Sequence, residues 1–219
     1  SDVSSSDLGA VLRSPHAHAK IRSIDTAAAK AAPGVLAVLT GADWEASGFN
    51  DLPVPGGKKR GSGPSLYGPR YPALVSDRAR WVGDYVAFVV AETLVQALDA
   101  AELIEVDYEP LPAIVSTAQA TQPGAPLVWD DCPNNICFVH KGGDKAATEA
   151  AFATAAHVVE HTFPITRVTA AAMEPRGSIG HYDRAADHYT VYTTLQRAHS
   201  FRGQLSQVLN MPESKVRVV

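Results

Sequence analysis

The sequence predicts an α+β fold with two domains. A strand–helix–strand pattern spans residues 86–108 in the first half, and short strand patterns accompany two helical patterns in the second half. Between these halves, residues 116–134 are polar, contain Pro and Gly, and show no periodicity, which is typical of a linker. The length of 219 residues is enough for two modest domains and for a core that needs no disulfide or metal to fold.

The composition excludes several classes of protein. Hydrophobic residues make up 46% and charged residues 19%, so the chain is not intrinsically disordered. The formal net charge of -4 argues against a general nucleic-acid or membrane-surface binder, which would carry a basic excess. No apolar run approaches the roughly 18–20 residues that a membrane-spanning helix needs. The two cysteines, Cys132 and Cys137, lack the spacing of a zinc half-site and are interpreted as structural or incidental thiols.

The first elements alternate between strand and helix. Residues 12–24 are expected to be extended on either side of Pro15. The Ala-rich residues 27–32 predict a short helix that Pro33-Gly34 ends. Residues 35–40 predict an apolar strand, which Gly41 closes.

A stretch rich in Gly and Pro follows over residues 51–72 and predicts a long surface loop. Its basic residues Lys58, Lys59 and Arg60 are interpreted as a solvated loop tip, because runs of exposed charge are most often that.

Residues 86–91 are the strongest buried-strand pattern in the chain, and Thr93 is a suitable N-cap for the helix that follows. In that helix an apolar stripe of helical period predicts the face that packs on the core; it consists of Leu94, Ala97, Leu98 and Ala101. Residues 104–108 then alternate apolar and acidic side chains, which indicates a half-exposed strand.

The second half is predicted to contain a short strand at residues 136–140 and a helix at 145–155. Further strands are expected at 157–165, 178–182, 189–195 and 215–219, with an amphipathic helix over 201–209. Because a strand that stops at Val219 lacks a turn and a partner after it, we expect the native polypeptide to continue.

Two stretches are candidates for a functional site. Residues 173–177 place Glu174 and Arg176 on either side of a proline, between two strand patterns. In residues 193–199 the amide of Gln196 stands where a strand is followed by a helix, a common position for side chains that face a ligand. A surface ion pair is the simpler interpretation of Glu174 and Arg176.

Other site motifs find little support. The sequence contains no phosphate-binding G-x-x-x-x-G-K-[ST] loop, and the Gly-Gly-Asp at 142–144 lacks the G-x-G-x-x-G pattern of a dinucleotide site. No nucleophile elbow is present, so a Ser/His/Asp triad is neither supported nor excluded.

Taken together, several ordered stretches resemble the molybdopterin-binding large subunit of the xanthine dehydrogenase, aldehyde oxidase and carbon monoxide dehydrogenase family. The resemblance covers nearly the whole chain, and its segments occur in the family's order. They are residues 12–25, 33–43, 82–87, 100–112, 125–128, 173–177, 196–199 with Arg202 and Leu205, and 212–219.

This resemblance implies an α/β-hammerhead domain at residues 1–115, a linker at 116–134, and the N-terminal part of the first molybdopterin-binding domain at 135–219. It also implies a hydroxylase-type oxidoreductase that acts on an aldehyde, an N-heteroaromatic compound or carbon monoxide, with water as the oxygen donor. The segment by itself is expected to be inactive. The alternative from another class is a scaffold or assembly module that has the fold but no cofactor.

One cofactor-binding residue is implied by the resemblance. Gln196 matches the family glutamine whose amide lies near the molybdenum, and Glu174 and Arg176 are expected to support the site. No catalytic residue and no metal ligand is expected in this segment.

The cofactor is expected to be molybdopterin, in its cytosine dinucleotide form if the enzyme is bacterial. Iron–sulfur clusters and FAD are expected on partner subunits, so the partners are the rest of the molybdenum subunit, an iron–sulfur subunit and an FAD subunit. We expect a cytoplasmic location, with the periplasm left open because the N-terminus looks incomplete.

Overall fold

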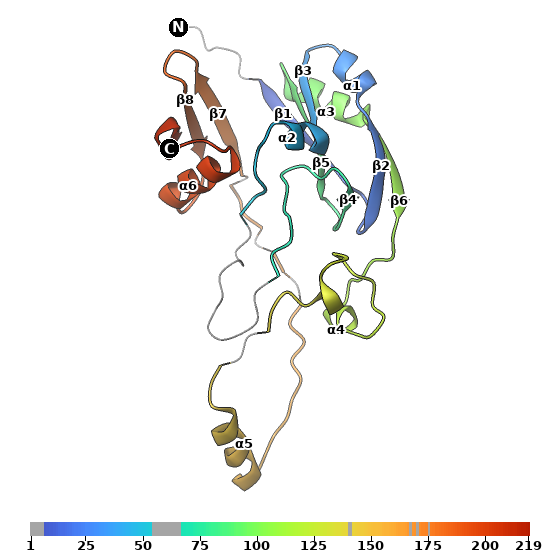
Figure 1. Cartoon of the computed structure of the whole chain (residues 1–219), viewed down its shortest axis with the longest axis vertical. Coiled ribbons are helices and arrows are strands. Elements are labelled where there is room, and N and C mark those ends of the chain that lie inside the picture. Colours follow the sequence, from blue (N-terminus) through green and yellow to red (C-terminus); the bar gives the residue numbers. More distant parts are fainter. Residues whose placement is uncertain (1–6, 54–66, 140–141, 167, 170, 175) are drawn as a thin grey trace.

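Two three-stranded sheets form the N-terminal half of the computed structural model, which describes residues 7–53, 67–139, 142–166, 168–169, 171–174 and 176–219 (Figure 1). The predicted loop tip at Lys58–Arg60 therefore lies outside the described residues. The first sheet has the order β1-β5-β3 and the second the order β4-β2-β6. Their strands are β1 (Leu8–Arg13), β2 (Ala19–Asp25), β3 (Val35–Thr40), β4 (Arg78–Ala79), β5 (Tyr85–Ala91) and β6 (Glu105–Pro110).

Strand β5 is central, as its apolar sequence predicts. It pairs antiparallel with both β1 and β3, so that Val89 lies between Ala10 and Val38. Helices α1 (Ala27–Ala31) and α3 (Leu94–Glu102) pack on this sheet and complete the core. The Thr93 hydroxyl accepts a hydrogen bond from the backbone N–H of Gln96 at 3.3 Å, which confirms Thr93 as the N-cap of α3.

The predicted buried face of α3 is partly wrong. Ala97, Ala100 and Ala101 are its buried residues, whereas Leu94 and Leu98 are 48% and 51% exposed. The physical reason is close approach: three small side chains on one face let the helix backbone lie directly on β1 and β5. The larger leucines are rotated away from the sheet.

A short helix that the sequence did not predict, α2 (Gly41–Ala46), follows β3. It begins with Thr40, whose backbone N–H and hydroxyl both donate to Oδ2 of Asp43, at 2.7 Å each. Gly41 was expected to close the strand, but it is the first residue of this helix. A Cβ at Gly41 would lie 2.6 Å from the backbone nitrogen of Ser76, so only glycine fits.

The C-terminal sheet has the order β7-β8-β9. Strands β7 (Ser178–Asp183) and β8 (His188–Thr193) form a hairpin, and β9 (Val216–Val218) pairs parallel with β8. Helix α6 (Ala198–Val208) and the 3-10 helix η2 (Glu213–Lys215) connect the two parallel strands. These elements confirm the predicted strands at 178–182, 189–195 and 215–219 and the helix at 201–209.

Helix α5 (Lys145–Thr154) confirms the helix predicted at 145–155 and lies far from the sheets (Figure 1). The strands predicted at 136–140 and 157–165 are wrong for every residue that the structure describes there. Residues 157–165 are extended, but no strand of the described chain pairs with them, and an apolar pattern cannot supply a hydrogen-bonding partner.

The stretch at 116–134 contains a one-turn helix, α4 (Thr117–Ala120), and ends in the 3-10 helix η1 (Pro133–Asn135). Its Asp130 forms a bidentate ion pair with Arg78 of β4, at 3.1 and 3.2 Å. Asn50, in the loop after α2, donates its backbone N–H to Val208 O at 2.8 Å and its side-chain amide to Gln207 O at 2.6 Å. These contacts join the N-terminal sheets to the stretch at 116–134 and to α6.

Candidate cofactor-binding site

The parallel strands β8 and β9 end on the same side of the C-terminal sheet, and we call this side its carboxyl edge. Because the strands are parallel, their carboxyl ends meet there: Thr193 N donates to Val219 O at 3.0 Å, and Val219 N donates to Val191 O at 2.9 Å. Ligands of open α/β sheets bind outside the carboxyl ends of the strands, where the connecting helices begin. This edge is therefore the candidate site.

Gln196 lies just beyond this edge, between the last residue of β8 and the first residue of α6. Its side chain is exposed. The predicted change from strand to helix at this residue is confirmed, because β8 ends at Thr193 and α6 begins at Ala198.

The N-terminus of α6 adds further hydrogen-bond donors. Its N-cap residue, Arg197, makes no side-chain capping hydrogen bond, and Ala198, His199 and Ser200 are exposed. The first-turn N–H groups of this helix have no partner within the helix and carry the positive end of its dipole. Together with the amide of Gln196, they favour an oxygen-rich or anionic ligand.

The second candidate stretch reaches the same edge. The Thr193 hydroxyl donates to Gly177 O at 3.1 Å and lies 2.8 Å from the Ser178 hydroxyl. Residues 173–177 therefore lead into β7 beside the end of β8. β8 ends at Thr193, three residues before Gln196.

The side chains of Glu174 and Arg176 are both exposed. Neither forms a hydrogen bond or an ion pair with Gln196 or with the other within the described part of the chain. The structure thus brings the two stretches together through their backbones and Thr193 rather than through the side chains that the sequence singled out.

A hollow of about 290 Å³ lies between α6 and β9 and begins at Ala198 and His199. Its wall carries His188, Arg202 and Arg217, and the Arg202 guanidinium is held by Glu213 at 2.8 Å. Sequence reasoning did not assign a site role to His188 or Arg217. His188 and Arg217 come together because β8 pairs with β9, and strand pairing leaves no local signal in the sequence. The local signal at this hollow is the i, i+3 spacing of His199 and Arg202 on α6.

The titratable cluster at the opposite edge stabilises the hairpin instead. Tyr182 OH donates to Asp187 at 2.9 Å, and the Lys215 ammonium contacts the same carboxylate. The hydrogen bond from Lys215 is the main reason that the pKa of Asp187 is lowered, and Asp187 in turn raises the pKa of Lys215. These groups precede β8 and β9, so the strands separate them from Gln196.

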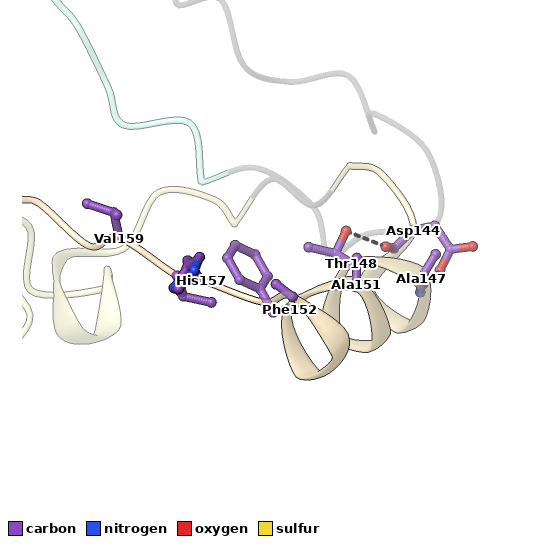
Figure 2. Close-up of a pocket in the computed structure, with 9 residues that line it drawn as sticks. Asp144, Ala147, Thr148, Ala151, Phe152, His157 and Val159 are labelled. Carbon is purple, nitrogen blue, oxygen red and sulfur yellow. Dashed lines mark hydrogen bonds between the residues drawn. The ribbon is translucent and has the colours of Figure 1, made fainter.

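A larger hollow of about 560 Å³ lies against α5 and the segment that follows it (Figure 2). Its polar groups serve the helix: Asp144 accepts from Ala147 N at 3.0 Å, and the Thr148 hydroxyl donates to Asp144 O at 2.7 Å. Figure 2 shows Phe152 beside His157 on an otherwise mostly apolar wall. These hydrogen bonds belong to the helix end and leave no arrangement of acid, base and nucleophile.

Within the described ranges, no three His, Cys, Asp or Glu side chains cluster in a way that could hold a metal ion. None of the helices in that part of the chain combines the length and the apolar character that crossing a bilayer demands.

Comparison with known families assigns both halves of the chain. Residues 2–112 match the profile of the aldehyde oxidase and xanthine dehydrogenase a/b hammerhead domain. The chain belongs to the aldehyde oxidase and xanthine dehydrogenase family. Residues 128–219 match the molybdopterin cofactor-binding domain, so the predicted fold, a hammerhead domain followed by a molybdenum-cofactor-binding domain, is confirmed.

The relatives are large subunits of this family. The carbon monoxide dehydrogenase large chain of Afipia carboxidovorans is 35% identical over 96% of this chain and 26% of its own length. The nicotine 6-hydroxylase large subunit of Paenarthrobacter nicotinovorans is 33% identical over 95% of this chain and 24% of its own. The chain thus spans about a quarter of the length of these two relatives.

The solved structures agree with this assignment. Reconstituted CO dehydrogenase from Oligotropha carboxidovorans superposes with a TM-score of 0.86 at 34% identity, over 100% of this chain and 27% of that one.

Proposed function

We propose that this chain forms part of the molybdenum-cofactor subunit of a hydroxylase-type oxidoreductase and contributes Gln196 to the cofactor site. The observation that carries the proposal is the position of Gln196. Its exposed amide follows the carboxyl edge of β8 and β9 and precedes a helix N-terminus without a side-chain cap. The site itself belongs to the region that matches the molybdopterin cofactor-binding domain.

The residues present fit such a cofactor. Molybdopterin, in its cytosine dinucleotide form, presents oxygen acceptors and phosphate groups, and the edge offers neutral amide and backbone N–H donors. When bound, the cofactor supplies the two-electron redox chemistry of hydroxylation, with water as the oxygen donor. Gln196 would donate a hydrogen bond to one of its oxygen acceptors and orient it, and a neutral amide does so without opposing changes of charge there.

Glu174 and Arg176 are proposed to support this site from the approach to β7. Their segment is tied to the end of β8 by the Thr193 hydroxyl, which bonds to Gly177 O at 3.1 Å. Both side chains are exposed on this approach and so are available to a group bound at the edge. We assign no catalytic residue to this chain, and we expect it to be inactive by itself.

We further propose that residues 1–115 form the hammerhead domain, 116–134 the linker, and 135–219 the first part of the molybdopterin-binding domain. The bounds of the two family matches, 2–112 and 128–219, support a division between them. The proposed partners are the remainder of the molybdenum subunit, an iron–sulfur subunit and an FAD subunit, in the cytoplasm or, alternatively, in the periplasm.

The substrate is proposed to be an aldehyde, an N-heteroaromatic compound or carbon monoxide. Relatives named for carbon monoxide and for nicotine are 35% and 33% identical to this chain, so identity does not choose between these substrates.

Gln196→Ala in the complete enzyme tests the proposed residue. We expect turnover to fall by about 10-fold to 100-fold, the usual effect of losing a group that orients a metal site, while molybdenum content falls much less. Gln196→Glu keeps the shape of the side chain and removes its N–H donors, so it should lose a similar share of turnover. The matched control is Gln204→Ala, an exposed glutamine within α6. Wild-type turnover in both Gln196 variants would contradict the proposal.

The scaffold alternative is tested separately by measuring molybdenum and pterin in the complex that contains this chain. We expect both to be present in near-stoichiometric amounts. If both are consistently absent from an intact complex, the enzyme proposal is wrong and the scaffold alternative is supported.

A further inference from the structure

The two cysteines of the chain lie on either side of one tight turn. Cys132 is 2% exposed and Cys137 is exposed. Between them, Asn134 and Asn135 both adopt left-handed backbone conformations, with φ of 58° and 55°. Two such residues in succession reverse the chain, and Asn135 N donates back to Cys132 O at 3.2 Å.

This turn is held from outside by the side chain of Asn135. Its Oδ1 accepts from Val128 N at 2.9 Å, and its Nδ2 donates to Ala120 O at 2.9 Å and to Pro126 O at 3.0 Å. Asparagine is among the residues that tolerate this backbone region, and three hydrogen bonds specify its orientation. The positions of both cysteines are therefore set by the fold and do not depend on a bond between them.

The turn brings the Cys132 sulfur beside the backbone of Cys137. Cys132 Sγ lies 3.7 Å from Ile136 O, the carbonyl oxygen of the peptide bond that joins Ile136 to Cys137. Burial, and then the neighbouring Cys137, raise the pKa of Cys132. Cys132 thus remains a protonated, shielded thiol, whereas the sulfur of Cys137 is open to a reagent.

We propose that Cys132 and Cys137 form a reversible disulfide, which makes this turn a redox modification site. The oxidant is a low-molecular-weight disulfide of the glutathione class. The Cys137 thiolate attacks one sulfur of the oxidant, forms a mixed disulfide and releases one thiolate. Cys132 then loses its proton and attacks the Cys137 sulfur, which releases the second thiolate. In sum, two protein thiols are oxidised, and one disulfide is reduced to two thiols.

The bond would stiffen the junction between the two halves of the chain. Tyr67, which belongs to the half with the hammerhead match, holds this segment at two points: its N–H donates to Cys137 O at 2.9 Å, and its hydroxyl donates to Asp131 at 2.5 Å. Closing the loop from residue 132 to residue 137 would tie both of these points together.

The test exposes the complete enzyme complex to glutathione disulfide, blocks the remaining thiols with an alkylating agent, and maps the peptides by mass spectrometry. We expect the peptide that holds both cysteines to lose two hydrogens and to take up no alkylating agent, and dithiothreitol to reverse this change. A stable glutathione adduct on Cys137 with Cys132 still free, or no reaction at Cys137, would overturn the proposal.

Two variants separate the steps of the reaction. Cys132→Ser should accumulate one glutathione on Cys137, because the thiol that resolves the mixed disulfide is missing. Cys137→Ser should acquire no adduct, because Cys132 is buried. A glutathione adduct on Cys132 in the second variant would also contradict the proposed order.

Discussion

The N-terminal sheets and the C-terminal sheet contain the same kinds of element but differ in how much they bury. Helix α3 buries three alanines against β1 and β5, and Val86 and Val89 of β5 are fully buried. Helix α5, of similar length, buries no residue, and every residue of β7 is exposed. Both regions therefore have regular backbone hydrogen bonding, and they differ in how many apolar side chains are removed from water.

The candidate site lies in the region that buries fewer side chains. Gln196 is in the less buried region, at the end of a strand and before a helix whose only buried residue is Val208. Binding sites are often formed by parts of a protein that are less stable by themselves, and contacts from elsewhere then hold them. Asn50 supplies one such contact, from the packed region to the last turn of α6.

The largest expected effect tests the contrast in burial directly. Val89→Ala removes two buried methyl groups between Ala10 and Val38, which should lower the free energy of unfolding by about 2 kcal/mol. Val159→Ala is the matched control: this side chain is 92% exposed, so the change should stay within about 0.5 kcal/mol. Urea denaturation of both variants measures the difference, and equal losses would contradict the contrast.

A smaller effect is expected at the start of α2. Hydrogen bonds from Thr40 to Asp43 lower the pKa of this carboxyl from its ordinary value of 3.8. An acid whose pKa is lowered by folding contributes stability above its unfolded value and loses it as the pH falls through its folded value. Asp43→Ala should therefore cost about 1 kcal/mol at pH 7, and this cost should shrink below about pH 4.

Denaturation of the Asp43→Ala variant at pH 7 and at pH 3 measures this change in cost. The control is Asp99→Ala, an exposed carboxylate of α3, which should have little effect at either pH. A cost for Asp43→Ala that does not depend on pH would show that the charge of Asp43 contributes nothing.

The smallest expected effect is at the contact between the two regions. Asn50→Ala removes the side-chain hydrogen bond to Gln207 O, worth about 0.5–1 kcal/mol, and leaves the backbone bond to Val208 in place. Hydrogen exchange should become faster in the last turn of α6 and stay unchanged in α3, where the core is internal. Gln204→Ala serves as the control within α6. Unchanged exchange in both helices of the Asn50 variant would mean that α6 is stable without this contact.

Local patterns in the sequence predicted most of the regular elements. The apolar strand at 35–40, the Thr93 cap and the helix before Asn210 depend on residues close together in the chain, so their signals were readable. The failures have non-local causes. Helix α2 begins at Gly41, where glycine is required because the backbone of Val75 and Ser76 lies close by. Leu94 turns away from the core because the alanines of α3, Ala100 among them, form the face that packs closely on the sheet.

By itself, the sequence determined the family, through ordered segments that cover nearly the whole chain, and it determined the position of Gln196 between a strand and a helix. The helices and strands follow from periodicity, which a short window of the chain contains. Only the tertiary structure decided that β9 runs parallel to β8, that Thr193 ties Gly177 to the same edge, and that Cys132 is buried while Cys137 is exposed. Each of these depends on the path of the chain in space, because hydrogen bonds and close contacts between distant residues leave no local periodicity behind.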